Sequence, residues 1–306
     1  MSGTLRVGVV PDFEALAAPL RARRALVRAV ADAGLDHLGL VDHISFRGGR
    51  GYDGLVQAAS ALSLHDELAV YLGVYLLPLR HPVPVARQLA SLAELAPGRL
   101  VLGVGIGGED RAEVSNCGVD PATRGRRMDE CLRVVRALAD GLPVTFHGAH
   151  VDVDQALVLP APEPRIPFIV GGRSQAAERR VARWGDGWLA LWVSPERFAA
   201  TVARVADLAQ TAGRVDPPTQ HGLSVWCGFG NDPLAGRRHL AAAMETTYGR
   251  AFDDFARWSP CGTPAQVAEQ LTPYIAAGCI TFNLIARAAS LGEALAGAAE
   301  VRRLLT

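Results

Sequence analysis

The chain alternates short apolar runs with amphipathic stretches eight times from one end to the other, and this alternation limits its fold more than any other feature. The apolar runs, such as residues 68–77 and 223–229, contain almost no charged side chains. The stretches between them place apolar residues three and four positions apart, as in residues 82–95. Continuous apolar strands that alternate with helices are typical of a parallel sheet covered by helices. The sequence therefore predicts an α/β fold.

Eight such units in 306 residues, with no linker between two halves, predict a (β/α)8 TIM barrel. We expect one domain over residues 1–306, with a small hairpin insertion at about residues 143–159 and a loop over residues 45–52. The alternative is a doubly wound two-domain enzyme, which would carry its glycine fingerprint in the first unit. The expected strands are residues 5–10, 37–41, 68–77, 167–172, 187–192, 223–229 and 280–286, together with a fourth strand at the apolar run 100–102, which enters a glycine-dense segment.

The glycine fingerprint of this chain lies in the fourth unit instead. Residues 97–109 read PGRLVLGVGIGGE and contain Gly105, Gly107 and Gly108 directly after a buried run. Glycine has no Cβ, so its backbone can approach a ligand closely. The stretch also matches the pattern G-x-G-x-x-G, which alone is a weak dinucleotide signal. We interpret it as one wall of a ligand site, with Glu109 following at once and no helix directly after it.

In a barrel, the chemistry belongs at the carboxyl ends of the strands. His43 follows the second strand and can exchange a proton near neutral pH, or it simply caps the strand end. Asp42 beside it either orients His43 or caps the loop. Residues 171–174 join the fifth strand to a helix, where a phosphate would be stabilised, although a tight turn with a serine cap explains them equally well. Trp192 either stacks on a bound ring or belongs to the core.

Composition excludes several classes of function. The formal net charge is zero, which argues against a general binder of nucleic acid or anionic membranes. No apolar run reaches the roughly 18 residues that span a bilayer. No two histidines or carboxylates have the spacing of zinc ligands, so we expect no metal site. Five cysteines without a C-x-x-C pair, and no signal peptide, predict free thiols in the cytoplasm.

The chain resembles the luciferase-like monooxygenase superfamily, whose members use FMN or the deazaflavin coenzyme F420. The resemblance rests on segments in the family's order, which are AGLDHLGLVDHISF, LGVYLLPLRHPVPVARQLASL, GRLVLGVGIGG, RRMDECLRVVRAL, FHGAHVDV, IPFIVGG and RRVARWGDGW. It implies a (β/α)8 barrel and a small-molecule substrate. It also implies that His43 is the active-site histidine beside the cofactor.

The resemblance further places Tyr75 and Leu76 at a bulge with a non-proline cis peptide that supports the ring. Residues implied to surround the cofactor and its phosphate are Asp42, Tyr75, Leu76, Gly105, Gly107, Gly108, Gly171, Gly172, Arg173 and Ser174. The proton-donating carboxylate of the sugar-phosphate dehydrogenases in this group aligns with Gly108, so we do not expect a sugar-phosphate substrate.

The Asp42–His43 pair matches the F420-dependent relatives, and F420 is therefore the expected cofactor. One alternative is an FMN-dependent two-component monooxygenase, which would take reduced flavin from a partner reductase. Another is a non-catalytic flavin-binding barrel. Relatives are often dimers, so a homodimer is expected by analogy.

Overall fold

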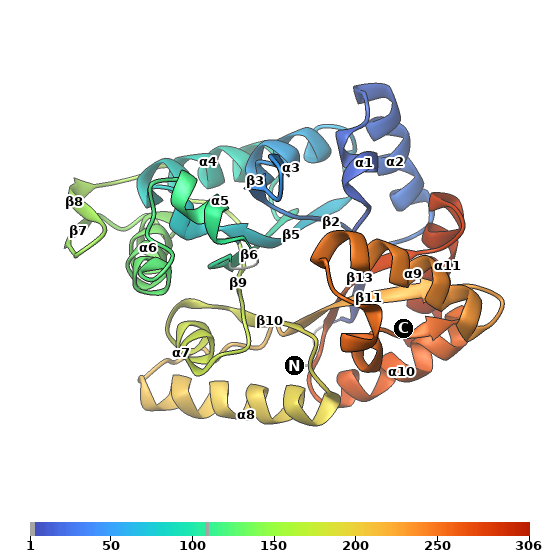
Figure 1. Cartoon of the computed structure of the whole chain (residues 1–306). Helices are drawn as coiled ribbons and strands as arrows, with labels where there is room; N and C mark the ends of the chain where they lie inside the picture. Colours follow the sequence, from blue (N-terminus) through green and yellow to red (C-terminus); the bar gives the residue numbers. More distant parts are fainter. Residues whose placement is uncertain (1–3, 108–109) are drawn as a thin grey trace. The chain divides into compact units, whose positions relative to one another are not determined.

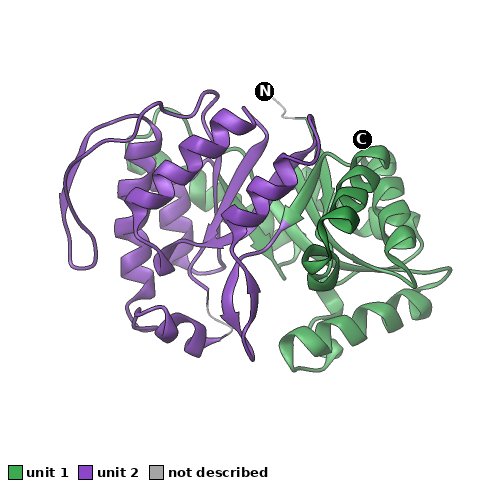
Figure 2. Ribbon diagram, turned by 90° about the horizontal axis from the view of Figure 1, so that it is seen from above, with its two compact units in different colours: residues 1–39, 187–306 green, residues 40–186 purple. Residues whose placement is uncertain are grey.

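The computed structural model describes residues 4–107 and 110–306 in two compact units (Figure 2). Unit 1 comprises residues 1–39 and 187–306, and unit 2 comprises residues 40–186. The single-domain boundary of residues 1–306 stays a prediction. No helix in the described part of the chain is long and apolar enough to cross a membrane.

Hydrogen bonding places the parallel strands in the order β10-β9-β6-β5-β2-β1-β13-β11, and β10 also pairs with β11. This is the strand order of a closed eight-stranded barrel, so the predicted (β/α)8 fold is confirmed. The strands are β1 (Arg6–Val9), β2 (His37–Leu40), β5 (Ala69–Leu76), β6 (Leu100–Gly105), β9 (Phe168–Gly171), β10 (Gly187–Leu191), β11 (Gly222–Phe229) and β13 (Thr281–Arg287), with the two-residue β12 (Cys261–Gly262) beside β11.

The strands are buried because helices cover them. Every residue of β6 and of β11 is buried, which is why these runs lack the polar alternation of an exposed sheet. Figure 1 labels the covering helices along the chain. They are α1 (Phe13–Ala17), α2 (Leu20–Asp32), α3 (Gly54–Leu62), α4 (Pro82–Leu95), α5 (Arg111–Asn116), α6 (Arg124–Ala139), α7 (Gln175–Trp184), α8 (Pro195–Thr211), α9 (Pro233–Tyr248), α10 (Pro264–Ala276) and α11 (Leu291–Leu305), with short 3-10 helices η1 (Leu77–Leu79), η2 (Phe252–Asp254) and η3 (Ala256–Trp258).

Capping side chains begin several helices, including the one at which a serine cap was expected. The Asp53 carboxylate accepts hydrogen bonds from the amides of Leu55 and Val56 at the start of α3, and the Ser174 hydroxyl accepts one from Ala177 in α7. Such caps satisfy amides that have no partner within the helix. The helix α4 has the bounds of the helical stretch predicted at residues 82–95, and in unit 2 the helices α4 and α6 pack against each other (Figure 1).

Two segments of unit 2 differ from the prediction. Residues 45–52, expected as a loop, belong to an antiparallel hairpin of β3 (His43–Phe46) and β4 (Arg50–Tyr52). No helix was expected directly after the glycine stretch, yet α5 begins at Arg111, where Asp110 caps it. Both segments are short and show no apolar period. The pairing of β3 with β4 and the Asp110 cap determine their structure instead. Residues 143–159 contain a second antiparallel hairpin, β7 (Val144–His147) with β8 (Asp152–Ala156), and its being an insertion stays a prediction.

Candidate functional site

Asp42 lies between β2 and β3 and is buried, with both carboxylate oxygens hydrogen-bonded by the protein. The two oxygens accept hydrogen bonds from both terminal nitrogens of Arg80, at 2.5 and 2.7 Å. They also accept hydrogen bonds from the amides of Gly54 and Leu76, each at 2.8 Å. A buried carboxylate is tolerated when it is paired and hydrogen-bonded in this way. Asp42 therefore ties the end of β2 to the start of α3 and to the end of β5.

Arg80 extends this arrangement in two directions. Its guanidinium forms a second ion pair with Asp53, at 2.8 Å, and lies over the ring of Tyr75, 4.3 Å from the ring centroid. Burial raises the pKa of the Tyr75 phenol above its ordinary value, although the Arg80 charge opposes this. Tyr75 and Leu76 are both buried. The structure thus places these two predicted site residues beneath Arg80, as part of the support of the strand end.

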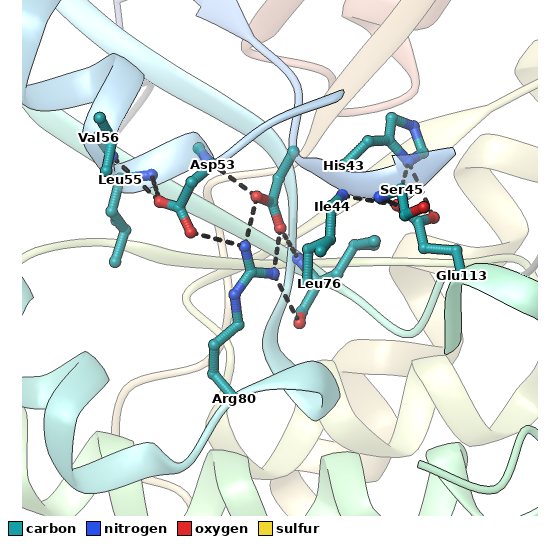
Figure 3. Close-up of polar contacts among 11 residues, drawn as sticks. His43, Ile44, Ser45, Asp53, Leu55, Val56, Leu76, Arg80 and Glu113 are labelled. Carbon is teal, nitrogen blue, oxygen red and sulfur yellow. Dashed lines mark hydrogen bonds and ion pairs between the residues drawn. The ribbon is translucent and has the colours of Figure 1, made fainter. Parts of the chain in front are cut away.

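His43 begins β3 and faces a carboxylate that was not among the site residues expected from the sequence. Its Nδ1 lies 3.1 Å from Oε2 of Glu113, a residue of α5 (Figure 3). The Glu113 side chain is 3% exposed, whereas that of His43 is 19% exposed. Oε1 of Glu113 also accepts the amides of Ile44, at 2.7 Å, and Ser45, at 3.2 Å. One buried carboxylate therefore orients the imidazole and the backbone that follows it.

Other contacts hold α5 against the hairpin. Asp110, which caps α5, accepts the amide of Arg47 at 2.9 Å. Val114 of α5 is buried in one apolar cluster with Leu76. The His43 ring stacks on Phe46, with 4.3 Å between the centroids. The sequence did contain one signal for this helix, because Asp110 and Glu113 have the D-x-x-E spacing of a helix start.

The bulge expected at Tyr75–Leu76 lies two residues earlier. The register of β5 against β6 shifts between Leu72 and Tyr75, and the non-proline cis peptide joins Gly73 to Val74. The prediction of its position was wrong because Tyr75 and Leu76 are regular, buried strand residues. Gly73 and Val74 are the partly exposed residues of this strand end.

Val74 explains two of the predicted glycines. A Cβ added to Gly105 would lie 2.4 Å from Cγ2 of Val74, and one added to Gly171 would lie 2.9 Å from Cγ1. Both distances are shorter than carbon atoms allow. The two glycines therefore leave room for Val74, so that three adjacent strand ends present a small apolar surface. A surface of this kind fits the flat ring of a flavin or deazaflavin.

The remaining glycines have left-handed backbone. Gly107 has φ of +67° and Gly172 has φ of +124°, conformations that glycine adopts readily. Gly172 and Arg173 are exposed beside the N-terminus of α7, which Ser174 caps. Helix N-termini stabilise phosphate groups, so the chemistry of this segment suits an anionic group of that kind. The predicted Gly108, and Glu109 after it, lie outside the described residues.

The chain is similar in sequence and in fold to known proteins. The family described as luciferase-like monooxygenase matches residues 7–280. A Mycobacterium tuberculosis protein described as uncharacterized is 40% identical over 149 residues, which are 49% of this chain and 51% of that protein. The chain thus matches about half the length of that relative.

A second relative is matched over more of its length. The F420-dependent glucose-6-phosphate dehydrogenase of Kineococcus radiotolerans is 27% identical over 279 residues, 81% of each chain. Among solved structures, an F420-dependent secondary alcohol dehydrogenase in complex with an F420-acetone adduct has a TM-score of 0.84 and 17% identity. That match covers 99% of this chain and 100% of that structure. At this identity, the likeness shows the fold alone.

Proposed function

The chain belongs to the family of luciferase-like monooxygenases, and from this premise we propose that it is an oxidoreductase with a flavin-type cofactor. The finer proposal is hydride transfer between coenzyme F420 and a small organic substrate. The observation that carries it is the partly exposed His43, whose Nδ1 is held 3.1 Å from the buried Glu113 carboxylate. His43 is the proposed catalytic residue, and Glu113 is a positioning residue.

The Glu113 contact assigns roles to the two ring nitrogens of His43. A carboxylate only accepts hydrogen bonds, so Nδ1 of His43 carries the hydrogen between them. Nε2 is then the nitrogen at which the neutral ring accepts a proton or from which the protonated ring donates one. In the proposed reaction, this nitrogen exchanges a proton with the substrate as the hydride moves. The backbone amides of Ile44 and Ser45 donate hydrogen bonds to the Glu113 carboxylate and so keep it from rotating away from His43.

When bound, the cofactor supplies the hydride or oxygen chemistry, and the protein supplies orientation. Val74, with Gly105 and Gly171 beside it, would support the ring. The loop after β6 would turn at Gly107. The cofactor phosphate would be held at the start of α7, by Gly172, Arg173 and Ser174. The buried residues Asp42, Tyr75 and Leu76 would support the site indirectly, because they hold the strand ends in place.

The preference for F420 has two supports. The Asp42–His43 pair resembles that of F420-dependent members, and the Kineococcus relative matched over 81% of its length carries F420 in its name. The name of the family, in contrast, favours a monooxygenase. The alternative proposal is therefore an FMN-dependent two-component monooxygenase that takes reduced flavin from a partner reductase. A sugar-phosphate substrate is not part of the proposal, because Gly108 replaces the expected carboxylate. A cytoplasmic homodimer remains an expectation.

The cofactor is tested by binding. Purified full-length protein is titrated separately with F420, FMN and reduced FMN, and the change in cofactor fluorescence or absorbance is recorded. We expect F420 to bind at least about tenfold more tightly than either form of FMN, which corresponds to about 1.4 kcal/mol. Tight FMN binding without F420 binding would overturn the preference and favour the monooxygenase.

The catalytic role is tested with His43→Gln. Oxidation of reduced F420 is followed with a panel of small carbonyl compounds, and the reverse reaction with alcohols. We expect kcat to fall by roughly 10²- to 10⁴-fold, the usual contribution of an acid–base group, with F420 affinity unchanged. His147→Gln is the matched control, because His147 also pairs with a carboxylate but lies exposed in the β7–β8 hairpin. A wild-type rate in His43→Gln would favour a non-catalytic role.

A further inference from the structure

Arg287 is a half-buried cation at the carboxyl end of β13 in unit 1. Its guanidinium lies over the ring of Trp226, 5.0 Å from the centroid, and donates one hydrogen bond to the Ala286 carbonyl at 2.7 Å. Among the described residues, no carboxylate lies within ion-pair distance of it. The acids that attract it from farther away are Asp12 and Glu14, and Asp12 is engaged in capping α1.

The Trp226 ring under Arg287 belongs to a group of four aromatic rings in unit 1, which we call the aromatic cluster. Trp192 lies 4.6 Å from Phe255 and 5.0 Å from Tyr248 between ring centroids, and Trp226 donates to the Tyr248 hydroxyl at 3.1 Å. Trp192 follows β10, Trp226 lies in β11, Tyr248 ends α9 and Phe255 follows it, and both β11 and α9 contact β13 (Figure 1). Trp192 and Tyr248 are partly exposed, so the cluster offers an accessible aromatic face.

The energetics of Arg287 favour an anionic ligand. Burial lowers the pKa of its guanidinium, and the charges of Asp12 and Glu14 act in the opposite direction. A half-buried charge without an adjacent counter-charge is destabilising, and an anion from outside would offset that cost. The arginine fork matches a carboxylate in two parallel hydrogen bonds, and aromatic rings stack on a flat apolar body.

We propose that Arg287 and the aromatic cluster form a binding site for an aromatic carboxylate. Arg287, Trp192 and Trp226 belong to the carboxyl-terminal parts or ends of three strands, where barrel enzymes bind their substrates. We take this carboxylate to be the substrate, and that step rests on the proposed oxidoreductase function. The binding site itself rests only on contacts within unit 1.

The test uses three probes that differ in charge and share one ring system. Full-length protein is titrated by calorimetry with 2-naphthoate, with 2-naphthamide and with 2-naphthylmethylamine. We expect naphthoate to bind at least about tenfold more tightly than the amide, and the ammonium compound more weakly still. Equal affinities for naphthoate and the amide, or no binding of naphthoate, would overturn the proposal.

Variants assign the effect to named side chains. Arg287→Gln should weaken naphthoate at least about tenfold and leave the amide unchanged, and Arg287→Lys should recover part of the loss. Trp192→Ala should weaken both ligands. Arg303→Gln is the matched control, because it removes the same charge from an exposed pair with Glu300 in the same unit. Unchanged naphthoate binding in Arg287→Gln contradicts the site.

Titration of the same variants with F420 separates this site from the proposed function. If Arg287→Gln weakens F420 as much as naphthoate, Arg287 serves the cofactor and the inference fails. If wild-type protein binds naphthoate through Arg287 but binds neither F420 nor FMN, the site stands and the proposed function fails.

Discussion

Oε2 of Glu113 lies 3.1 Å from Nδ1 of His43, and the two residues are 70 positions apart in the chain. The pair joins the first residue of the β3–β4 hairpin to a short helix that follows the fourth barrel strand in sequence. Because the carboxylate also accepts two hairpin amides, the position of the imidazole depends on where α5 lies.

Glu113→Gln should therefore impair turnover without impairing cofactor binding. The amide still accepts from Ile44 and Ser45, but it can turn its donor toward His43 and disturb the ring. We expect kcat to fall by about 10- to 100-fold, less than the loss of the imidazole itself, while the Kd for F420 stays within about twofold. Glu130→Gln is the control, because Glu130 accepts three hairpin amides far from His43 in sequence. Similar kcat values for the two variants would contradict the positioning role.

Asp42→Asn should reduce the stability of the protein. The substitution leaves the half-buried Arg80 without its bidentate partner, and breaking a buried pair typically costs about 3–5 kcal/mol. Urea denaturation measures the change in the free energy of unfolding. Asp53→Asn is the matched comparison. Asp53 also pairs with Arg80 but is exposed, and asparagine caps a helix nearly as well, so we expect about 0–1 kcal/mol. Equal losses of unfolding free energy in the two variants would contradict the larger contribution expected of the buried Asp42–Arg80 ion pair.

Gly105→Ala should destabilise the protein through contact with Val74. The added methyl group would lie 2.4 Å from Cγ2 of Val74, and overpacking of this kind costs about 1–3 kcal/mol. Val74→Ala should restore most of this loss in the double variant, which thermal or urea unfolding can measure. Gly292→Ala is the control, because its added Cβ meets nothing closer than 3.9 Å. If the double variant is no more stable than Gly105→Ala, Val74 is not the reason for the glycine.

Acid should destabilise the protein partly through His37. This side chain is fully buried, and burial lowers its pKa from 6.5 to about 4, although a 2.5 Å hydrogen bond with Asn283 opposes the shift. Because the folded pKa lies below the unfolded value, the unfolded state takes up the proton first as the pH falls. The stability is complete above about pH 6.5, and about 2 kcal/mol of it is lost by about pH 5.

The measurement is the free energy of unfolding at several pH values between about 7.5 and 5. His37→Gln should show a shallower pH dependence than the wild-type protein. His221, which is also buried with a pKa of about 4, retains its own contribution in that variant. In exposed His147, hydrogen bonding to Asp152 raises the pKa, so His147→Gln should not flatten the curve in this way. An unchanged slope in His37→Gln would assign the acid sensitivity to other groups.

Features set by neighbouring residues could be predicted from the sequence. The apolar runs and helical periods placed all eight barrel strands to within a few residues, because each depends on burial along its own segment. Ser174 was recognised as a cap because a cap bonds an amide only three residues away. His43 was recognised as the residue that follows a barrel strand.

The contacts around these residues depend on segments that are distant in the chain, and no local pattern specifies them. Glu113 reaches His43 only because α5 packs against the β3–β4 hairpin, and both are too short to show an apolar period. Gly105 is needed because strand register places Val74 beside it, although the sequence indicated only a close approach to something. Burial, periodicity and capping are properties of a segment, and the chain sequence determines them directly. The partners of His43, Asp42 and Gly105 follow from strand register and helix docking, which exist only once the barrel has folded.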